Sequence, residues 1–171
     1  SSVYGYNTTA GFWETAELKE IGDGTANSAV VACLNVLATS FAEPALQVVK
    51  RDQVFGDREV DYKHPVSELY RRPNEFMSSS LLSHYIVLSL NAHGDAFIFK
   101  NRNANGKVVA LVPLMPGLVD VRGNTSKLIT HYEYYASQKN ATSGEPVKID
   151  PKDIIHIRQG IDPNDHRRGH A

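Results

Sequence analysis

The stretch DAFIFKNRNANGKVVALVPL at residues 95–114 decides the fold class. Its two halves, DAFIFKNR and KVVALVPL, are rich in β-branched and aromatic residues, and the turn residues NANG separate them. Two such runs joined by a short turn that contains Asn-Gly are typical of a β-hairpin. We therefore predict two antiparallel strands here.

A helix is predicted immediately before this hairpin. The segment SLLSHYIVLSLNAH at residues 80–93 places Leu81, Tyr85 and Leu88 at three- and four-residue spacing, which gives a helix one apolar face. Serines 78–80 can begin the helix, and Gly94 is suited to its left-handed C-terminal cap. We expect this helix to pack on the hairpin that follows.

Upstream, residues 29–41 are apolar on nearly every side, which predicts a deeply buried helix that ends before Pro44. Cys33, the only cysteine of the chain, lies in this run, and we interpret it as a small buried thiol. Residues 46–50 (LQVVK) follow as a short predicted strand. Thr25 or Asn27 can cap the N-terminus of the helix predicted at residues 29–41.

A shorter helix is predicted between two prolines. Pro65 suits the first helical turn, Pro73 ends the helix, and an apolar face carries Val66, Leu69 and Tyr70. Beyond the hairpin, further strands are predicted at residues 118–122, 128–135 and 153–158. Helices and strands thus occur in blocks, which predicts an α+β fold of buried helices packed on antiparallel strands and hairpins. We divide the chain into an N-terminal arm or loop at residues 1–24 and one core domain at residues 25–171.

The composition restricts the possible functions. The 171 residues are 42% hydrophobic and 22% charged, as in soluble globular proteins, and suffice for one domain with its own core. The net charge of -1 argues against a surface built to bind nucleic acid phosphates tightly. No apolar stretch approaches the length of a membrane-spanning helix.

Motifs for catalysis are missing from the sequence. Neither GDGTANS nor GNTSK has the spacing of a phosphate-binding loop, and no serine lies in a GxSxG elbow. We therefore predict no catalytic, cofactor-binding or metal-binding residues. The alternative is a small metal-dependent hydrolase, because potential ligands of zinc or manganese lie close together near the C-terminus, although without a rigid ligand spacing. These residues are His156, Asp162, Asp165, His166 and His170.

Four blocks of sequence follow one another from residue 25 onward. They are ANSAVVACLNVLATSFAEPALQVV at 26–49, HPVSELYRRPN at 64–74, HGDAFIFKNRNANGKVVALVPLMPGLVDV at 93–121 and DIIHIRQGIDPNDHRRG at 153–169. In order and spacing they resemble the portal proteins of tailed double-stranded-DNA bacteriophages. The second block resembles the HPL, Leu and RPN pattern of that family, the third its GNAY strand and hairpin, and the fourth its DVLHIR strand and DP turn.

The resemblance assigns a structural signature to particular positions. The residues at the signature positions are His64, Pro65, Leu69, Arg72, Pro73, Asn74, Gly94, Asp95, Ala96, His156, Arg158, Asp162, Pro163 and Gly169. Asp95 and Phe97 depart from the family, because they replace the usual Asn and Tyr of GNAY. His170 and Ala171 stand where the family commonly has Ser-Pro.

The resemblance implies a structural protein without enzymatic activity or a cofactor. The chain would form the wing-like core of a portal subunit, without the stem, clip and crown. Family members form a ring, commonly a dodecamer, at one vertex of the capsid, through which viral duplex DNA passes during packaging and ejection without sequence-specific contacts. The implied partners are the terminase large subunit, the capsid protein and head-tail connector proteins, with no membrane. The implied location is the virion, after assembly in the cytoplasm of the host bacterium.

Overall fold

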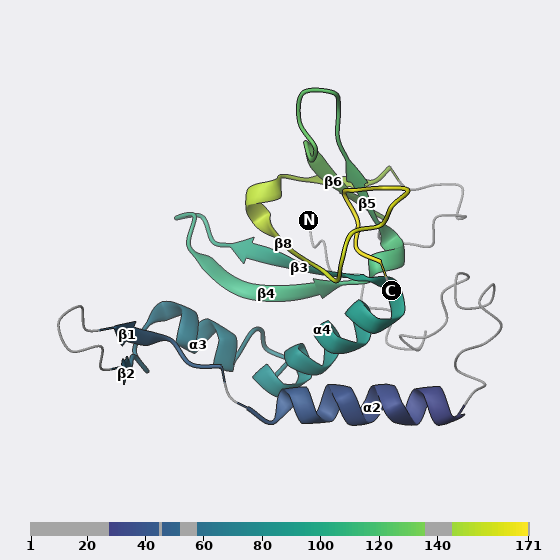
Figure 1. Cartoon of the computed structure of the whole chain (residues 1–171). Helices are drawn as coiled ribbons and strands as arrows, with labels where there is room; N and C mark the ends of the chain where they lie inside the picture. Colours follow the sequence, from purple (N-terminus) through teal and green to yellow (C-terminus); the bar gives the residue numbers. More distant parts are fainter. Residues whose placement is uncertain (1–27, 45, 52–57, 136–144, 171) are drawn as a thin grey trace.

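The computed structural model describes residues 28–44, 46–51, 58–135 and 145–170. In these residues, three helices accompany two antiparallel three-stranded sheets and one two-stranded ribbon (Figure 1). The predicted α+β class is therefore confirmed. The predicted N-terminal arm or loop and the two candidate helix caps before residue 28 lie outside the described residues.

The predicted hairpin forms the centre of the first sheet. Strands β3 (Asp95–Arg102) and β4 (Val108–Leu114) pair antiparallel, with Phe97 opposite Leu114. Strand β8 (Ile154–Arg158) pairs with the other edge of β3, which gives the order β4-β3-β8. Gly106 in the turn has a φ of 76°, the left-handed conformation that the Asn-Gly turn requires. The prediction of this hairpin is confirmed.

The second sheet has the order β5-β6-β7, formed by Val119–Arg122, His131–Tyr134 and Val147–Ile149. The strand predicted at residues 128–135 begins later than expected. Residues 124–127 form a tight turn, in which Oδ1 of Asn124 accepts hydrogen bonds from the backbone N–H groups of Ser126 and Lys127. Strand β7 was not predicted, because three residues are too short to show an alternating pattern.

Helix α4 (Ser79–His93) has the caps that the sequence predicts. Oγ of Ser78 accepts a hydrogen bond from the backbone N–H of Leu81, and Gly94 ends the helix with a φ of 71°. Its buried face meets one side of the first sheet. There Leu82 and Tyr85 form a hydrophobic cluster with Ala96, Ile98 and Leu111.

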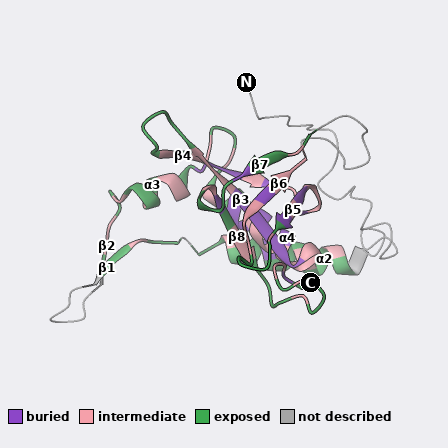
Figure 2. Cartoon of the chain, turned by 90° about the horizontal axis from the view of Figure 1, so that it is seen from above, coloured by how far each residue is buried: buried purple, intermediate pink, exposed green. Residues whose placement is uncertain are grey.

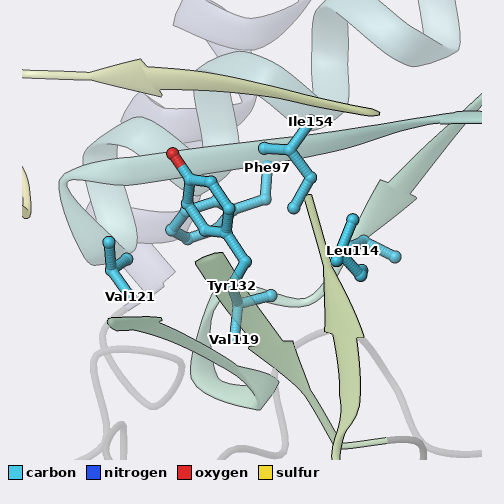
Figure 3. Close-up of a cluster of buried hydrophobic side chains, with 7 residues drawn as sticks. Phe97, Leu114, Val119, Val121, Tyr132 and Ile154 are labelled. Atoms are coloured by element: carbon cyan, nitrogen blue, oxygen red, sulfur yellow. The ribbon is translucent and has the colours of Figure 1, made fainter. Parts of the chain in front are cut away.

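The other side of the first sheet packs on the second sheet. Phe97 points to this side because successive residues of a strand face opposite ways, whereas Ala96 and Ile98 face helix α4. Figure 3 shows the resulting core, and Figure 2 shows that the buried residues gather in the two sheets and α4. The buried members of this core are Phe97, Leu114, Val119, Val121, Tyr132, Ile149 and Ile154.

Helix α2 (Ser28–Ala42) lies beside α4 on the side away from the sheets (Figure 1). The prediction that this helix is deeply buried is wrong, because Ala38 is its one buried residue among those whose burial is described. Cys33 is exposed, so its interpretation as a buried thiol is wrong as well. The physical reason is that α4 covers a single face of α2.

Strands β1 (Val49–Arg51) and β2 (Arg58–Val60) form an antiparallel two-stranded sheet, called here the β1–β2 ribbon. Strand β1 begins three residues later than the predicted strand at 46–50. Helix α3 (Pro65–Arg71) follows and confirms the predicted helix between two prolines. In both Figure 1 and Figure 2 the ribbon projects sideways from the body of the molecule.

Candidate functional site: a buried carboxylate that holds the C-terminal loop

The carboxylate of Asp95 is the most densely hydrogen-bonded buried polar group of the described chain. The residue is 0% exposed, although it begins strand β3 directly after the cap of α4. Its oxygens lie 2.8 Å from His156 Nε2, 3.1 Å from Arg168 Nε and 2.8 Å from the backbone nitrogen of Gly169. A buried charge is tolerated only when it is paired and hydrogen-bonded, and these three groups meet that condition.

The imidazole of His156 links Asp95 to the second sheet. Its Nδ1 lies 3.2 Å from the hydroxyl of Tyr132, while its Nε2 faces the carboxylate. This geometry fits an imidazole that donates from Nε2 and accepts the Tyr132 hydroxyl hydrogen at Nδ1. The ring also stacks on Phe97, with centroids 4.3 Å apart. His156 therefore serves as a structural bridge.

Arg168 makes a second bridge between the sheets. Its Nε donates to Asp95 on β3, and its Nη1 donates to the carbonyl oxygen of Val119 on β5 at 3.1 Å. The guanidinium carbon lies 5.9 Å from the centre of the Phe97 ring. The planar guanidinium carries its N–H donors on separate nitrogens in a fixed arrangement, so Arg168 can serve two acceptors that lie on different strands.

Residues 159–170 form a loop, called here the C-terminal loop, that is fixed beside the C-terminal end of α4 (Figure 1). The backbone N–H of Gln159 donates to the carbonyl oxygen of Gly94, and that of His170 donates to the carbonyl oxygen of Gln159, both at 2.8 Å. Within the loop, the N–H of Asp162 donates to the carbonyl oxygen of Arg168 at 3.0 Å. The Asp95 carboxylate thus holds a loop whose own turns are closed by backbone hydrogen bonds.

The DP turn of this loop is exposed and locally stabilised. Oδ1 of Asp162 accepts a hydrogen bond from the N–H of Asn164 at 2.7 Å, and Pro163 lies between them. Asp165 makes a two-point ion pair with Arg167, and hydrogen bonding to this guanidinium lowers the pKa of the Asp165 carboxyl. The guanidinium of Arg158 donates to the carbonyl oxygen of His166 at 2.9 Å.

The other signature residues lie around helix α3. Nδ1 of His64 accepts a hydrogen bond from the N–H of Val66 and caps the helix, while Pro65 occupies its first turn. Leu69 packs against the cluster under α4. Arg72 ends the helix, and its N–H donates to the carbonyl oxygen of Glu68.

The RPN block attaches helix α3 to the free edge of strand β4. The carbonyl oxygen of buried Pro73 accepts a hydrogen bond from the N–H of Leu111 at 2.7 Å. The side chain of Asn74 donates to the carbonyl oxygen of Leu111 at 2.9 Å and accepts from the N–H of Phe76. This block therefore protects an edge that would otherwise present unpaired backbone groups.

The structure gathers the signature residues in two places. One group, from His64 to Asn74, lies at the junction of α3 and β4, and the other lies around Asp95 and the C-terminal loop. Sequence reasoning missed Arg168 and Tyr132 as partners of the second group. Once Asp95 is known to be buried, its carboxylate is expected to have a cationic partner. The sequence does not say which residue supplies that partner.

The alternative metal site is not assembled. Within residues 28–44, 46–51, 58–135 and 145–170, no group of three or more His, Cys, Asp or Glu residues is placed to hold a metal ion. His156 faces Asp95, and Asp165 faces Arg167, so two of the five proposed ligands already have other partners. The same part of the chain has no helix of the length and apolar character needed to cross a membrane.

A shallow, open pocket lies where α3 meets the start of α4. Charged side chains of both signs line it together with Phe76 and Met77. Ser78, also in the lining, serves as the cap of α4. Oγ of this serine accepts a hydrogen bond from the backbone N–H of Leu81, so the lining serine is engaged in the helix cap.

Comparison with known proteins gives a consistent result. A family model described as phage portal protein matches residues 28–171. The portal protein of Enterobacteria phage HK97 is 26% identical over 146 residues, which are 81% of this chain and 32% of that protein. The chain therefore spans about a third of the length of this curated relative.

Two solved structures share the fold. One chain from the neck of an empty gene transfer agent particle, computed with C6 symmetry, matches with a TM-score of 0.70 and 19% identity, over 92% of this chain and 40% of that chain. Another, from the neck of a native particle computed with C12 symmetry, matches with a TM-score of 0.68 and 18% identity, over 91% of this chain and 38% of that chain.

Proposed function

The chain belongs to the phage portal protein family, and from this premise we propose that it supplies a structural core to the subunit of a portal ring. The ring would occupy one vertex of a phage or phage-like capsid and form the passage for DNA during packaging and ejection. Residues 25–171 would form the wing-like part of that subunit. The chain would act as architecture, without catalysis of its own.

The observation that carries this proposal is the agreement of two independent comparisons over nearly the whole chain. The family match covers residues 28–171, and the fold of a neck subunit from a ring-symmetric particle covers 92% of the chain. The hydrogen-bonded signature residues support it further, since both groups of them fix connections between elements of the fold.

The proposed partners follow from the role of a portal. Neighbouring copies would close the ring, commonly of twelve subunits, as the C12 symmetry of one related neck suggests. The terminase large subunit, the capsid protein and head-tail connector proteins would dock on the ring, which is assembled in the host bacterial cytoplasm and retained in the virion. Duplex DNA would pass without sequence-specific contacts, in keeping with a net charge of -1.

Electron microscopy of the purified protein, expressed with all the sequence that its gene encodes, tests this proposal. We expect closed rings with a single subunit number, because a head-to-tail interface that closes gives a cyclic oligomer. Native mass spectrometry of the same sample gives the subunit number. Monomers at every concentration, with or without capsid protein, would overturn the proposal.

A further inference from the structure

The cap of helix α3 depends on the protonation state of one imidazole. Nδ1 of His64 lies 3.2 Å from the backbone nitrogen of Val66 and accepts the hydrogen bond of its N–H group. An imidazole nitrogen accepts only while it carries no proton, and in the imidazolium both ring nitrogens are donors. A neutral His64 therefore caps α3, and a proton on its Nδ1 removes the cap.

The cap of helix α4 has no such dependence. There Oγ of Ser78 accepts the hydrogen bond of the Leu81 N–H at 3.3 Å, and a serine hydroxyl keeps its acceptor lone pairs at any ordinary pH. A positive charge on the His64 ring would add to the difference between the two helices, because it is unfavourable at the N-terminal end of a helix. The two helix starts thus respond differently to acid.

A partner for a protonated His64 lies in the segment before the helix. Residues 61–64, called here the connector, join the β1–β2 ribbon to α3. Hydrogen bonding to Lys50, together with the charges of Lys50 and His64, lowers the pKa of the Asp61 carboxyl in this connector. Asp61 is therefore negatively charged throughout the pH range in which an imidazole titrates.

The charged groups around His64 come, among the described residues, from three elements. The connector contributes Asp61 and Lys63, and strand β1 contributes Lys50, whose ammonium lies 3.1 Å from the Asp61 carboxylate. The first turn of α3 contributes Glu68, which lines the open pocket between α3 and α4. Asp61 is thus the carboxylate placed to attract a protonated His64.

The first turn of α3 has few other contacts that hold it. The helix has no buried residue, and its C-terminal end is fixed to β4 through Pro73 and Asn74. At its N-terminal end, Oγ of Ser67 donates to the carbonyl oxygen of Asp61 at 2.9 Å. Loss of the His64 cap therefore loosens the end of α3 that adjoins the connector, beyond which the ribbon projects (Figures 1 and 2).

We propose that His64 is a proton switch between helix α3 and the β1–β2 ribbon. In the neutral form, its Nδ1 caps α3 through the N–H of Val66. In the protonated form, the imidazolium turns from the helix toward the Asp61 carboxylate, and the first turn of α3 opens. An imidazole in water takes up its proton at about pH 6.5, so the switch works close to neutral pH. The inference does not depend on the proposed portal role.

Amide hydrogen exchange of the 171-residue chain, followed residue by residue by NMR, tests the switch. The protection of the Val66 N–H, corrected for the intrinsic pH dependence of exchange, should fall about fivefold between about pH 8 and about pH 5. Leu81 is the internal control, because Ser78 caps its N–H at both pH values and its protection should stay constant. Equal protection of Val66 at the two pH values would overturn the proposal.

Two substitutions at position 64 separate the cap from the charge. In His64→Asn the side-chain oxygen can accept from the same N–H without titrating, so the protection of Val66 should no longer depend on pH. His64→Ala has no side-chain acceptor, so Val66 should show at about pH 8 the low protection that the wild type has at about pH 5. If the protection in His64→Asn falls as in the wild type, another group senses the pH and the proposal is wrong.

Asp61→Asn tests the second partner of the imidazole. Its remaining side-chain oxygen can still accept the hydrogen bond of the Lys63 N–H, which Asp61 Oδ1 accepts at 3.2 Å. Without the carboxylate, the loss of Val66 protection should move to lower pH by about half a pH unit, the size expected for an exposed ion pair. Circular dichroism at about pH 8 checks that all three variants are folded. An unchanged midpoint in Asp61→Asn would contradict the turn toward Asp61.

Discussion

The backbone of Gly169 lies directly against the backbone of Gly94. A Cβ atom added at Gly169 would lie 2.0 Å from the carbonyl oxygen of Gly94, and one added at Gly94 would lie 2.6 Å from the carbonyl carbon of Gly169. The cap of helix α4 and the end of the C-terminal loop therefore meet without side chains between them. This contact brings the N–H of Gly169 to the Asp95 carboxylate.

The first prediction concerns this contact. Gly169→Ala should lower the free energy of unfolding by at least about 2 kcal/mol, because backbone atoms must move to make room for a methyl group. Gly106→Ala is the matched control, since Gly106 has a φ of 76° but nothing within 4 Å of the added Cβ. There we expect about 1 kcal/mol from the left-handed conformation alone.

Urea unfolding measures both values, and amide hydrogen exchange locates the change. Gln159 and His170 should lose protection in Gly169→Ala, because their N–H groups hold the C-terminal loop in place. An equal loss of stability in both variants would mean that the close approach of the two glycines does not matter.

The second prediction concerns the Asp95 carboxylate. Asp95→Ala should destabilise the protein by about 3–5 kcal/mol, because Arg168 and His156 lose their buried acceptor. Asp95→Asn keeps one acceptor oxygen and should lose less, about 1–3 kcal/mol. Glu145→Ala, which removes an exposed carboxylate, should change stability by less than about 0.5 kcal/mol. Equal losses in Asp95→Ala and Glu145→Ala, measured by urea unfolding, would contradict the structural role of Asp95.

The sequence predicts the fold best where the signal is local. The hairpin has its Asn-Gly turn, and helix α4 has a serine and a glycine at its ends, so both are confirmed within one or two residues. The exposure of one face of α2 could not be predicted from its sequence. An apolar helix indicates that its side chains are buried against something, but its sequence does not say which residues they contact. Leu37 and Phe41 of this helix, which we expected to be buried, are exposed.

The site required contacts that no local pattern contains. The partners of Asp95 lie 61, 73 and 74 residues further along the chain. The family resemblance identified Asp95, His156 and Gly169 as signature positions, yet it gave no reason for them. The structure supplies the reason, and it adds Arg168, whose guanidinium joins the two sheets.

The third prediction is a dependence of stability on acidic pH. The guanidinium of Arg122 donates a hydrogen bond to Glu133 and lowers the pKa of this carboxyl below its usual 4.5. Stability from this pair is therefore fully present above pH 4.5 and is lost as the pH falls through the lowered pKa. Glu133→Gln should show a shallower loss of stability below that pH.

Urea midpoints across the acidic range, at low and high salt, check this prediction. High salt should reduce the difference between wild type and Glu133→Gln, since the pair is partly exposed. Glu75→Gln, at an exposed residue, serves as the control. A variant whose acid profile matches the wild type would show that the pair contributes nothing.

The fourth prediction is a dependence on alkaline pH through Tyr85. Its buried hydroxyl has one hydrogen, which the carbonyl oxygens of Leu114 and Phe97 share, and burial raises its pKa to about 12 from the ordinary 10.0. Below pH 10 the Tyr85 hydroxyl is protonated in both the folded and the unfolded chain, so its contribution to stability is fully present. Between pH 10 and 12 only the folded chain holds it, and stability falls by at most about 1.4 kcal/mol per pH unit for this one group.

Tyr85→Phe separates the two effects of this hydroxyl. At neutral pH the variant should lose about 1–3 kcal/mol of stability, because the carbonyl oxygens of Leu114 and Phe97 lose the hydroxyl hydrogen that they share. Above pH 10 its stability should fall less steeply than that of the wild type, although not to zero slope, since burial also raises the pKa of Tyr132 and Tyr134. Tyr62→Phe, at an exposed side chain, is the control. The unfolded variant has one phenol fewer to ionise, so its stability should depend less on pH. If its stability falls with pH as steeply as that of the wild type, the Tyr85 hydroxyl is not buried in solution.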